Sequence, residues 1–536
     1  MLGAMENTRP HGLVRRCLVL LTLCAMSLPC LAQAPASAPA ERRIELDLAR
    51  ASQPVDRFYA LSVGSDYPGT LLRDDAQAHL KLAVDELGFR YLRFHGLFHD
   101  ALGTVRSVDG KIVYDWTRID RLYDQLLAKG IRPFVELGFT PDALKTSDQT
   151  LFYWKGNTSH PKTAMWNHLV DAYLRHVIAR YGIDEVRSWY FEVWNEPNLK
   201  DFWEGADQSA YFDLYANTAR TLKAVDARLR VGGPSTAGAA WVPELLAFCH
   251  AQGLPIDFVT THTYGVDGGF LDEEGKQDTK LLASPDAIVA DVRNVRGEID
   301  ASAFPGLPLF FTEWSSSYSP RDYVHDSYIN APYVLTKLKQ VRGLAQGMSY
   351  WAYTDLFEEA GPPPSPFHGG FGLINREGLR KPTWFAYKYL NQIAGLEIPA
   401  DDAQLWAAVD GERIAVLAWD WQQPQQALSN TPFYTRKLPA GSAAALAVHL
   451  KNVAPGRYRL QLHRTGYLKN DAMSLYIDMG RPKDLSAAQL SQLQAATADA
   501  AEQDRVVTVA ADGVLRLDVP MRSNDVVLVT LAPARK

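Results

Sequence analysis

Cysteine is scarce in this sequence of 536 residues, which contains four in all. Three of them, Cys17, Cys24 and Cys30, lie in one apolar stretch near the N-terminus, and Cys249 stands alone in the rest of the chain. A single cysteine forms no internal disulfide, so stability has to come from a large apolar core. Cys249 follows apolar residues in a helix-like segment, which predicts a buried structural thiol rather than a catalytic one.

Runs of positive charge are also missing. The formal net charge is −6 and no basic cluster stands out, which argues against nucleic acid as a partner. The apolar run at residues 17–31 follows Arg15 and Arg16 and is too short to cross a bilayer comfortably. Together with small residues near Ala32, this pattern predicts a secretory signal peptide over residues 1–32.

We therefore expect export across the inner membrane, to the periplasm or the outside of the cell, with no transmembrane segment in the mature chain. Residues 33–40, rich in alanine and proline, are typical of a linker. Lipidation at Cys24 or Cys30 is an alternative, but Leu23 and Pro29 are poor residues to precede a lipidated cysteine.

From residue 56 to residue 394, short apolar runs alternate with stretches of helical periodicity. Eight strand-like runs fall at residues 58–63, 90–94, 132–137, 189–194, 230–233, 258–263, 307–312 and 348–353. Helical stretches between them include residues 76–87, 116–129, 165–181, 209–229 and 331–345. Strand and helix alternating eight times predict an α/β fold, a catalytic (β/α)8 TIM barrel whose parallel strands are buried on both sides.

After residue 394 the pattern changes to alternating strands punctuated by turn residues. The strand-like segments are residues 405–409, 414–419, 445–450, 458–462, 506–508, 515–519 and 526–531, with one helix-like segment at 486–500. Residues 395–536 are therefore predicted to form an antiparallel β-sandwich accessory domain. Residues 41–55 contain an alternating strand at 44–48, which we expect to join the sheet of this C-terminal domain.

Two glutamates mark the ends of predicted barrel strands, where barrel enzymes place their catalytic groups. Glu196 stands in Trp-Asn-Glu-Pro-Asn and Glu313 in Phe-Thr-Glu-Trp. Such a pair suits glycoside hydrolysis, in which one carboxyl group protonates the leaving oxygen and the other attacks the anomeric carbon. We assign Glu196 as acid/base and Glu313 as nucleophile. The alternative for each is a structural glutamate paired with an arginine.

Further polar residues fall at other strand ends. Asn195 is placed to bind a sugar 2-hydroxyl, and His262 and Tyr264 alternate off one strand towards the same site. The Tyr264 hydroxyl would hold the nucleophile ionised. Glu192 shares the face of Glu196, and we interpret it as a buried structural partner of Arg93.

His95 and His99 are four residues apart, a spacing that suits a pair of metal ligands on a helix. This segment passes from strand to loop and offers no third ligand, so we expect neither a metal nor a cofactor. Trp203, Trp351 and Phe371 are aromatic residues that would serve either as sugar platforms or as core. The glycine- and proline-rich residues 361–372 are predicted to form a packed loop walling the site.

Several motifs together resemble glycoside hydrolase family 39, which holds β-xylosidases and α-L-iduronidases that retain anomeric configuration. The resemblance spans most of the mature chain and rests on segments 191–199, 261–264, 312–314, 350–359 and 367–374. It implies Glu196 as acid/base and Glu313 as nucleophile. It also implies substrate contacts, namely His95, Asn195, His262, Tyr264, Trp351 and Glu358.

The expected partner is a small oligosaccharide. Glu358 and Glu359 would repel a sugar carboxylate, and a wall from Phe367 to Phe371 would exclude a hydroxymethyl group. The sequence thus favours a β-xylosidase acting on xylo-oligosaccharides over an α-L-iduronidase. An arabinofuranosidase, an endoglycanase and a non-catalytic sugar-binding protein remain alternatives, and the last would lack one of the two carboxylates.

Overall fold

A computed structural model describes residues 41–534 of the chain. The predicted signal peptide and linker, residues 1–40, lie outside the described residues. Within residues 41–534, no helix is both long and apolar enough to cross a membrane.

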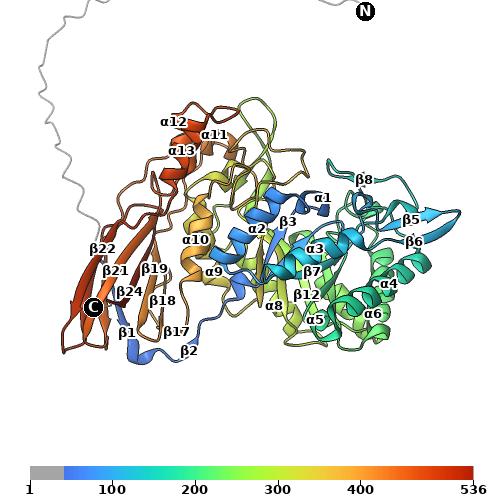
Figure 1. Cartoon of the computed structure of the whole chain (residues 1–536), viewed down its shortest axis with the longest axis horizontal. Coiled ribbons are helices and arrows are strands. Elements are labelled where there is room, and N and C mark those ends of the chain that lie inside the picture. Colours follow the sequence, from blue (N-terminus) through green and yellow to red (C-terminus); the bar gives the residue numbers. More distant parts are fainter. Residues whose placement is uncertain (1–40, 535–536) are drawn as a thin grey trace, which may run out of the picture. The chain divides into compact units, whose positions relative to one another are not determined.

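Eight parallel strands close into a barrel, which confirms the predicted fold class (Figure 1). Around the barrel they are β3 (Ser62–Ser65), β4 (Tyr91–Phe94), β7 (Arg132–Leu137), β10 (Tyr190–Val193), β11 (Arg230–Thr236), β12 (Phe258–Tyr264), β15 (Leu309–Ser315) and β16 (Gly347–Tyr350). The first strand begins later than predicted because Phe58–Ala60 forms a turn of 3-10 helix. A layer of apolar side chains, Leu61, Phe134, Phe258 and Phe310, fills the interior.

One helix follows each barrel strand and packs outside it. These helices are α2 (Asp74–Leu87), α3 (Thr117–Ala128), α4 (Thr163–Tyr181), α6 (Gln208–Val225), α7 (Val242–Gln252), α8 (Val289–Asp300), α9 (Asn330–Val341) and α10 (Pro382–Asn391). Their periodicity explains the packing: α3 buries Ile119, Leu122, Tyr123 and Leu126, one stripe of a 3.6-residue repeat. Cys249 lies buried on α7, as expected of a structural thiol.

Three small hairpins, which the sequence did not predict, emerge from loops at the carboxyl ends of barrel strands. They are β5 (Val105–Val108) with β6 (Lys111–Tyr114), β8 (Thr150–Leu151) with β9 (Gly156–Asn157), and β13 (Val266–Leu271) with β14 (Gln277–Leu281). Two short helices, α1 (Pro68–Leu71) and α5 (Ile183–Arg187), complete this half of the chain. The hairpins therefore lie at the end of the barrel that holds the predicted site.

The C-terminal strands form two sheets. A seven-stranded sheet orders β2 (Gln53–Pro54), β17 (Leu396–Glu397), β18 (Leu405–Asp410), β19 (Arg413–Trp419), β24 (Val526–Pro533), β21 (Gly456–Thr465) and β22 (Gln503–Val509), the last five lying side by side in Figure 1. A three-stranded sheet orders β1 (Arg42–Asp47), β20 (Leu446–Lys451) and β23 (Leu515–Val519). Three helices lie between these strands in sequence: α11 (Asn430–Tyr434), α12 (Ala472–Asp478) and α13 (Ala487–Ala496).

The two sheets share one apolar core, as a β-sandwich requires. Ile44 and Leu46 of β1 belong to the same buried cluster as Val416 of β19 and Leu460 of β21. The expected strand near residue 44 is present and pairs within the smaller sheet, where β1 runs parallel to β20 and β20 runs antiparallel to β23, so this sheet is mixed. Two chain segments about four hundred residues apart form this pair, and no local pattern sets their direction.

Candidate active site

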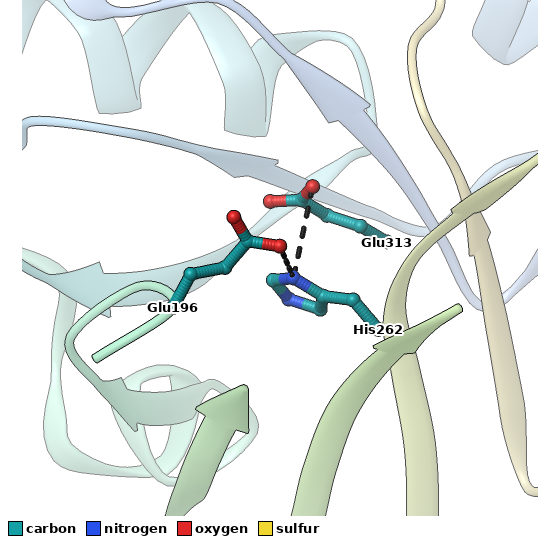
Figure 2. A group of neighbouring side chains, drawn as sticks. All are labelled: Glu196, His262 and Glu313. Atoms are coloured by element: carbon teal, nitrogen blue, oxygen red, sulfur yellow. Dashed lines mark hydrogen bonds and ion pairs between the residues drawn. The ribbon is translucent and has the colours of Figure 1, made fainter. Parts of the chain in front are cut away.

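The predicted catalytic residues meet at the carboxyl end of the barrel. Glu196 lies in the loop after β10, Glu313 lies near the end of β15, and His262 and Tyr264 end β12. His262 lies between the two glutamates, with its Nδ1 2.9 Å from Glu196 Oε1 and 3.7 Å from Glu313 Oε2 (Figure 2). One carboxylate oxygen of each glutamate and the imidazole nitrogen all lie within 4.8 Å of one another.

A strained turn presents Glu196. Trp194 and Glu196 both have positive φ, 71° and 47°, a conformation that side-chain-bearing residues rarely adopt. The turn is held by neighbouring loops, since the Glu196 amide donates to the Ser235 carbonyl at 2.8 Å and the Trp194 indole donates to the Phe202 carbonyl at 2.8 Å. The Trp-Asn-Glu-Pro motif is thus a backbone arrangement that aims one carboxyl group into the barrel mouth.

Arg93, on β4, is buried and ties the strand ends together. Its guanidinium donates to Glu192 at 2.6 Å and to Glu313 at 2.7 Å, and it pairs with Glu136 at 3.1 Å. These carboxylates raise the pKa of Arg93 although burial opposes its charge. The interpretation of Glu192 as a structural partner of Arg93 is confirmed.

Asn195 is held by the same guanidinium. Its Oδ1 accepts from Arg93 Nη2 at 2.8 Å, which fixes the orientation of the amide. The Asn195 Nδ2 atom is buried and has no hydrogen-bond partner within residues 41–534. An amide N–H group in this condition is free to donate to a substrate hydroxyl.

Glu313 receives a donor on each oxygen. Arg93 donates to Oε1, and the Tyr264 hydroxyl donates to Oε2 at 2.7 Å. Burial and the Glu313 charge raise the pKa of Tyr264 well above its usual value, so the phenol keeps its proton and remains a donor. Both contacts stabilise Glu313 as a carboxylate, the form that a nucleophile needs.

Glu196 differs from Glu313 in having no cationic hydrogen-bond donor among residues 41–534. Burial is the main cause that raises the pKa of Glu196 well above its usual value, and the charge of Glu313 is the second. Its neighbour His262 is neutral, because burial and then the Arg93 charge lower the pKa of that imidazole. The two carboxyl groups therefore lie in different surroundings: burial and a nearby charge favour the protonated form of Glu196, while Glu313 accepts hydrogen bonds from Arg93 and Tyr264.

The His95 imidazole lies among the carboxyl groups of Glu136, Glu313 and Glu359. Its Nδ1 lies 2.7 Å from Glu136 Oε2 and its Nε2 lies 3.3 Å from Glu359 Oε1. Burial opposes protonation, but Glu136 and Glu359 outweigh it and raise the pKa of His95 well above its usual value. Burial also raises the pKa of Glu359 to about 7.

The structure places the two glutamates after the eighth strand differently. Glu359 lines the cavity together with Glu196, Glu313, Trp351 and Phe371, whereas Glu358 is not among the lining residues. The Glu358 side chain instead lies 3.4 Å from Arg73 in a partly exposed pair. Residues 355–361 contain no helix or strand, so no periodicity in the sequence distinguishes the two neighbours.

A cavity of about 460 Å³ opens above these groups. Trp351 and Phe371 form part of its wall, while Phe367 packs on Tyr476 of α12 instead. Gly64 of β3 makes room for Trp351, since a Cβ there would lie 2.0 Å from the indole ring. Trp203 is fully buried, stacks on His160 and belongs to the core, so it is not a sugar platform.

The loop carrying Phe371 is packed, as predicted for residues 361–372. Buried Lys381 pairs with Asp326 at 2.6 Å and with Asp355 at 2.7 Å, and donates to the Gly370 carbonyl at 2.9 Å. The Gly369 and Gly372 amides donate to the same two aspartates, each at 2.7 Å. The loop backbone is thus clamped on a buried ion cluster, which fixes the position of the wall.

The His95 and His99 rings point to different partners. His99 Nε2 lies 2.9 Å from the Trp154 carbonyl oxygen, while His95 faces Glu136, so the two rings do not share a ligand site. Within residues 41–534, the group with metal-like spacing is Glu196, His262 and Glu313. A cation there would occupy the lone pairs that both carboxyl groups need for proton transfer and attack.

We predict that Glu313→Gln lowers the pKa of Glu196. Removing the Glu313 charge removes a repulsion that disfavours ionised Glu196, so the proton should leave at lower pH. The pKa of Glu196 should stay partly raised in this variant, because burial is the larger cause. Carbon-13 NMR titration of the Glu196 carboxyl group measures the change, with Glu358→Gln as a distant control. An unchanged value would mean that burial alone sets the acidity.

Comparisons with known proteins agree with this geometry. The chain matches the model of the glycosyl hydrolases family 39 over residues 42–515. It is 71% identical to the family 39 enzyme from Xanthomonas axonopodis pv. citri, with a TM-score of 0.93 over 94% of this chain and 100% of that one. It is 64% identical to a monomeric β-xylosidase from Caulobacter crescentus CB15, with a TM-score of 0.91 over 92% of this chain and 100% of that one.

A β-xylosidase of Caldicellulosiruptor saccharolyticus is 38% identical over 447 residues, which cover 82% of this chain and 88% of the relative. The resemblance expected from the motifs is thereby confirmed. The chain belongs to family 39 of the glycosyl hydrolases.

Proposed function

We propose that this protein is a retaining β-xylosidase that removes xylose from the non-reducing ends of short xylo-oligosaccharides. The observation that carries this is the Glu196–Glu313 pair, whose nearest oxygens lie within 4.8 Å. Retaining glycosidases hold their carboxyl groups about 5 Å apart, closer than the gap that admits a water in inverting enzymes. The named activity of the β-xylosidase relatives supports the choice of sugar.

In the first step, Glu313 attacks the anomeric carbon while Glu196 gives its proton to the departing glycosidic oxygen. Arg93 and Tyr264 hold Glu313 in line, and the free N–H group of Asn195 is available to the sugar 2-hydroxyl. The carbon–oxygen bond to the leaving group breaks, and an ester forms between Glu313 and the xylosyl unit.

In the second step, water replaces the leaving group. Esterification removes the Glu313 charge, and this lowers the pKa of Glu196, since that charge is one of the two main causes of its elevation. Glu196 is then able to accept a proton from water as the water attacks the ester-linked carbon. Xylose departs with its original anomeric configuration, and both glutamates return to their starting states.

Charge in the cavity favours a neutral sugar. Among the described residues that line it there is no lysine or arginine. Arg93 is committed to its own carboxylates beneath the site. The His95 imidazole, whose pKa is raised, already pairs with Glu136 and Glu359. A uronate carboxylate would thus find no lysine or arginine to bind it, which argues against α-L-iduronidase activity.

The sugar and the stereochemistry are tested together. We expect hydrolysis of nitrophenyl β-xyloside, with far less activity on the β-glucoside, the α-arabinofuranoside and the α-iduronide. Trp351 and Phe371 wall the cavity where a hydroxymethyl group would add bulk. Proton NMR of the first product should show β-xylose before mutarotation. The α anomer, or a different preferred sugar, would overturn the proposal.

The roles of the two glutamates are separable by azide. Glu196→Ala should keep activity on substrates with good leaving groups and lose about 10²–10⁴-fold on poor ones, because only the latter need protonation. Azide should accelerate this variant and yield β-xylosyl azide, detected by mass spectrometry and NMR. Glu313→Ala should be inactive on every substrate. Appearance of the β-azide with Glu313→Ala instead would reverse the assignments.

Adjacent glutamates provide a matched test of the sugar site. Glu359→Gln should lower kcat/KM on nitrophenyl β-xyloside by roughly 10- to 100-fold, the value of a hydrogen bond to a charged group. Glu358→Gln should change it less than about twofold, because a surface ion pair with Arg73 contributes little. Steady-state kinetics measure both. A larger loss at Glu358 would return the substrate contact to the residue that the motif implied.

We also propose that the protein is exported, to the periplasm or beyond. Support comes from the sequence: Arg15 and Arg16 precede the apolar run at residues 17–31, with small residues at the expected cleavage point. The N-terminal sequence of protein recovered from a cell fractionation tests this. A cytoplasmic chain that retains residues 1–32 would contradict it.

A further inference from the structure

Glu196, His262 and Glu313 have the composition of a metal-ligand set as well as that of a catalytic group. Both carboxyl groups lie beside the His262 imidazole and point toward it (Figure 2). Carboxylate oxygens and an imidazole nitrogen are ligands that zinc takes in proteins. The three residues come from the loop after β10, from β12 and from β15, so the closed barrel brings them together rather than any local spacing.

The distances between the three ligand atoms suit one small cation. Zinc bonds oxygen and nitrogen at about 2.0–2.2 Å, which puts neighbouring ligand atoms of a tetrahedral site about 3.4 Å apart. His262 Nδ1 lies 2.9 Å from Glu196 Oε1 and 3.7 Å from Glu313 Oε2, one distance below that spacing and one above it. One ligand atom from each residue lies within 4.8 Å of the other two. Small movements of the two glutamate side chains would therefore bring all three atoms onto one ion.

These atoms have the lone pairs that an ion needs. Arg93 donates to Oε1 of Glu313, whereas Oε2 is the oxygen that faces His262. The Tyr264 hydroxyl donates to Oε2, but a carboxylate oxygen has two lone pairs, so one of them remains. His262 supplies the third lone pair, because burial and then the Arg93 charge lower the pKa of its imidazole and keep the ring neutral.

The other ring nitrogen of His262 has a partner that would fix the orientation of the ring. His262 Nε2 lies 3.4 Å from Ser235 Oγ, and that hydroxyl oxygen in turn accepts a hydrogen bond from Arg93 at 3.1 Å. Metal-bound histidines usually donate their second N–H group to a nearby acceptor, which holds the ring in the tautomer that binds the metal. A proton on Nε2 leaves the lone pair of Nδ1 directed at the two glutamates.

Charge and access also suit a divalent cation. Ionised Glu196 and Glu313 would together carry two negative charges, and both residues line the cavity of about 460 Å³. The described lining contains no lysine or arginine, and the His95 imidazole in it already pairs with Glu136 and Glu359. A hydrated ion is thus able to enter from the cavity and to keep one water molecule as its fourth ligand.

We propose that Glu196, His262 and Glu313 form an inhibitory zinc site, in which the ion takes the place of the substrate. The bound ion occupies the Glu313 oxygen that attacks the anomeric carbon and the Glu196 oxygen that carries the proton, so the zinc-bound enzyme is inactive. Magnesium and calcium prefer sets of oxygen ligands without imidazole and bind this site weakly. The inhibition rests on the proposed function, whereas the binding of the ion does not.

Isothermal titration calorimetry with zinc chloride measures the binding on the full chain without any substrate. We expect one site for zinc and a much weaker response to magnesium or calcium chloride. His262→Gln and Glu196→Gln should each lower the zinc affinity at least about tenfold, the loss that follows even when an outer partner of a metal ligand is removed. Cobalt chloride adds a spectroscopic readout, since a tetrahedral site gives Co²⁺ a strong visible absorption band that both variants should lose.

His250→Gln is the matched control, because His250 is exposed on α7, away from the barrel mouth. This variant should bind zinc and cobalt as the unaltered chain does. Circular dichroism shows whether each variant is folded, so that a loss of affinity is assigned to the ligand and not to unfolding.

Steady-state kinetics measure the inhibition. Zinc should raise the apparent KM for nitrophenyl β-xyloside and leave kcat unchanged, as a competitor of the substrate does, and EDTA should restore the rate. Equal zinc affinity in all variants, no binding by calorimetry, or inhibition that saturating substrate does not relieve would overturn the site. If zinc binding depends on His262 and Glu196 but the unaltered enzyme hydrolyses no xyloside, the proposed function fails while the zinc site stands.

Discussion

The active site depends on one buried guanidinium. Arg93 lies under the barrel mouth with no exposed surface and contacts Glu136, Glu192 and Glu313, each from a different strand. A buried cation is costly unless carboxylates surround it, and buried carboxylates are costly unless a cation neutralises part of their charge. Each charge is tolerated because of the others, so the ends of β4, β7, β10 and β15 are held in one arrangement.

The difference between the two catalytic carboxyl groups follows from how this charge is shared. Glu313 receives donors from Arg93 and Tyr264, whereas Glu196 faces a neutral imidazole. Two chemically identical side chains thus meet different surroundings across a gap of less than 5 Å, and burial together with the nearby charge raises the pKa of Glu196. In the proposed double displacement, esterification of Glu313 removes this contrast between the first step and the second.

The cavity wall rests on a second buried ion cluster. Lys381, Asp326 and Asp355 hold a loop that has neither helix nor strand, through its carbonyl and amide groups. Gly370 and Gly372 of this loop have no room for a side chain, since a Cβ at either position would lie within 2.6 Å of an Asp355 atom. An irregular segment is made rigid in this way, and one wall of the cavity is fixed.

The order of strands and helices is readable in the sequence because burial on both faces of a parallel sheet demands continuous apolar runs, and packing on one side demands a 3.6-residue repeat. The positions of Glu196 and Glu313 follow from the same rule, as each ends its own strand. Strand parity places Glu192 on the face of Glu196, and its interpretation as a buried partner of Arg93 agrees with the structure.

Other features were decided by the tertiary structure. The parallel pairing of β1 with β20 joins distant segments, and the choice of Glu359 over Glu358 falls in a loop without periodicity. Trp203 and Trp351 have the same chemistry in sequence, yet one lies in the core and the other faces the cavity. Sequence patterns show which residues are buried and with what spacing along the chain. The proton affinity and the orientation of a side chain depend on neighbours that only the folded chain brings together.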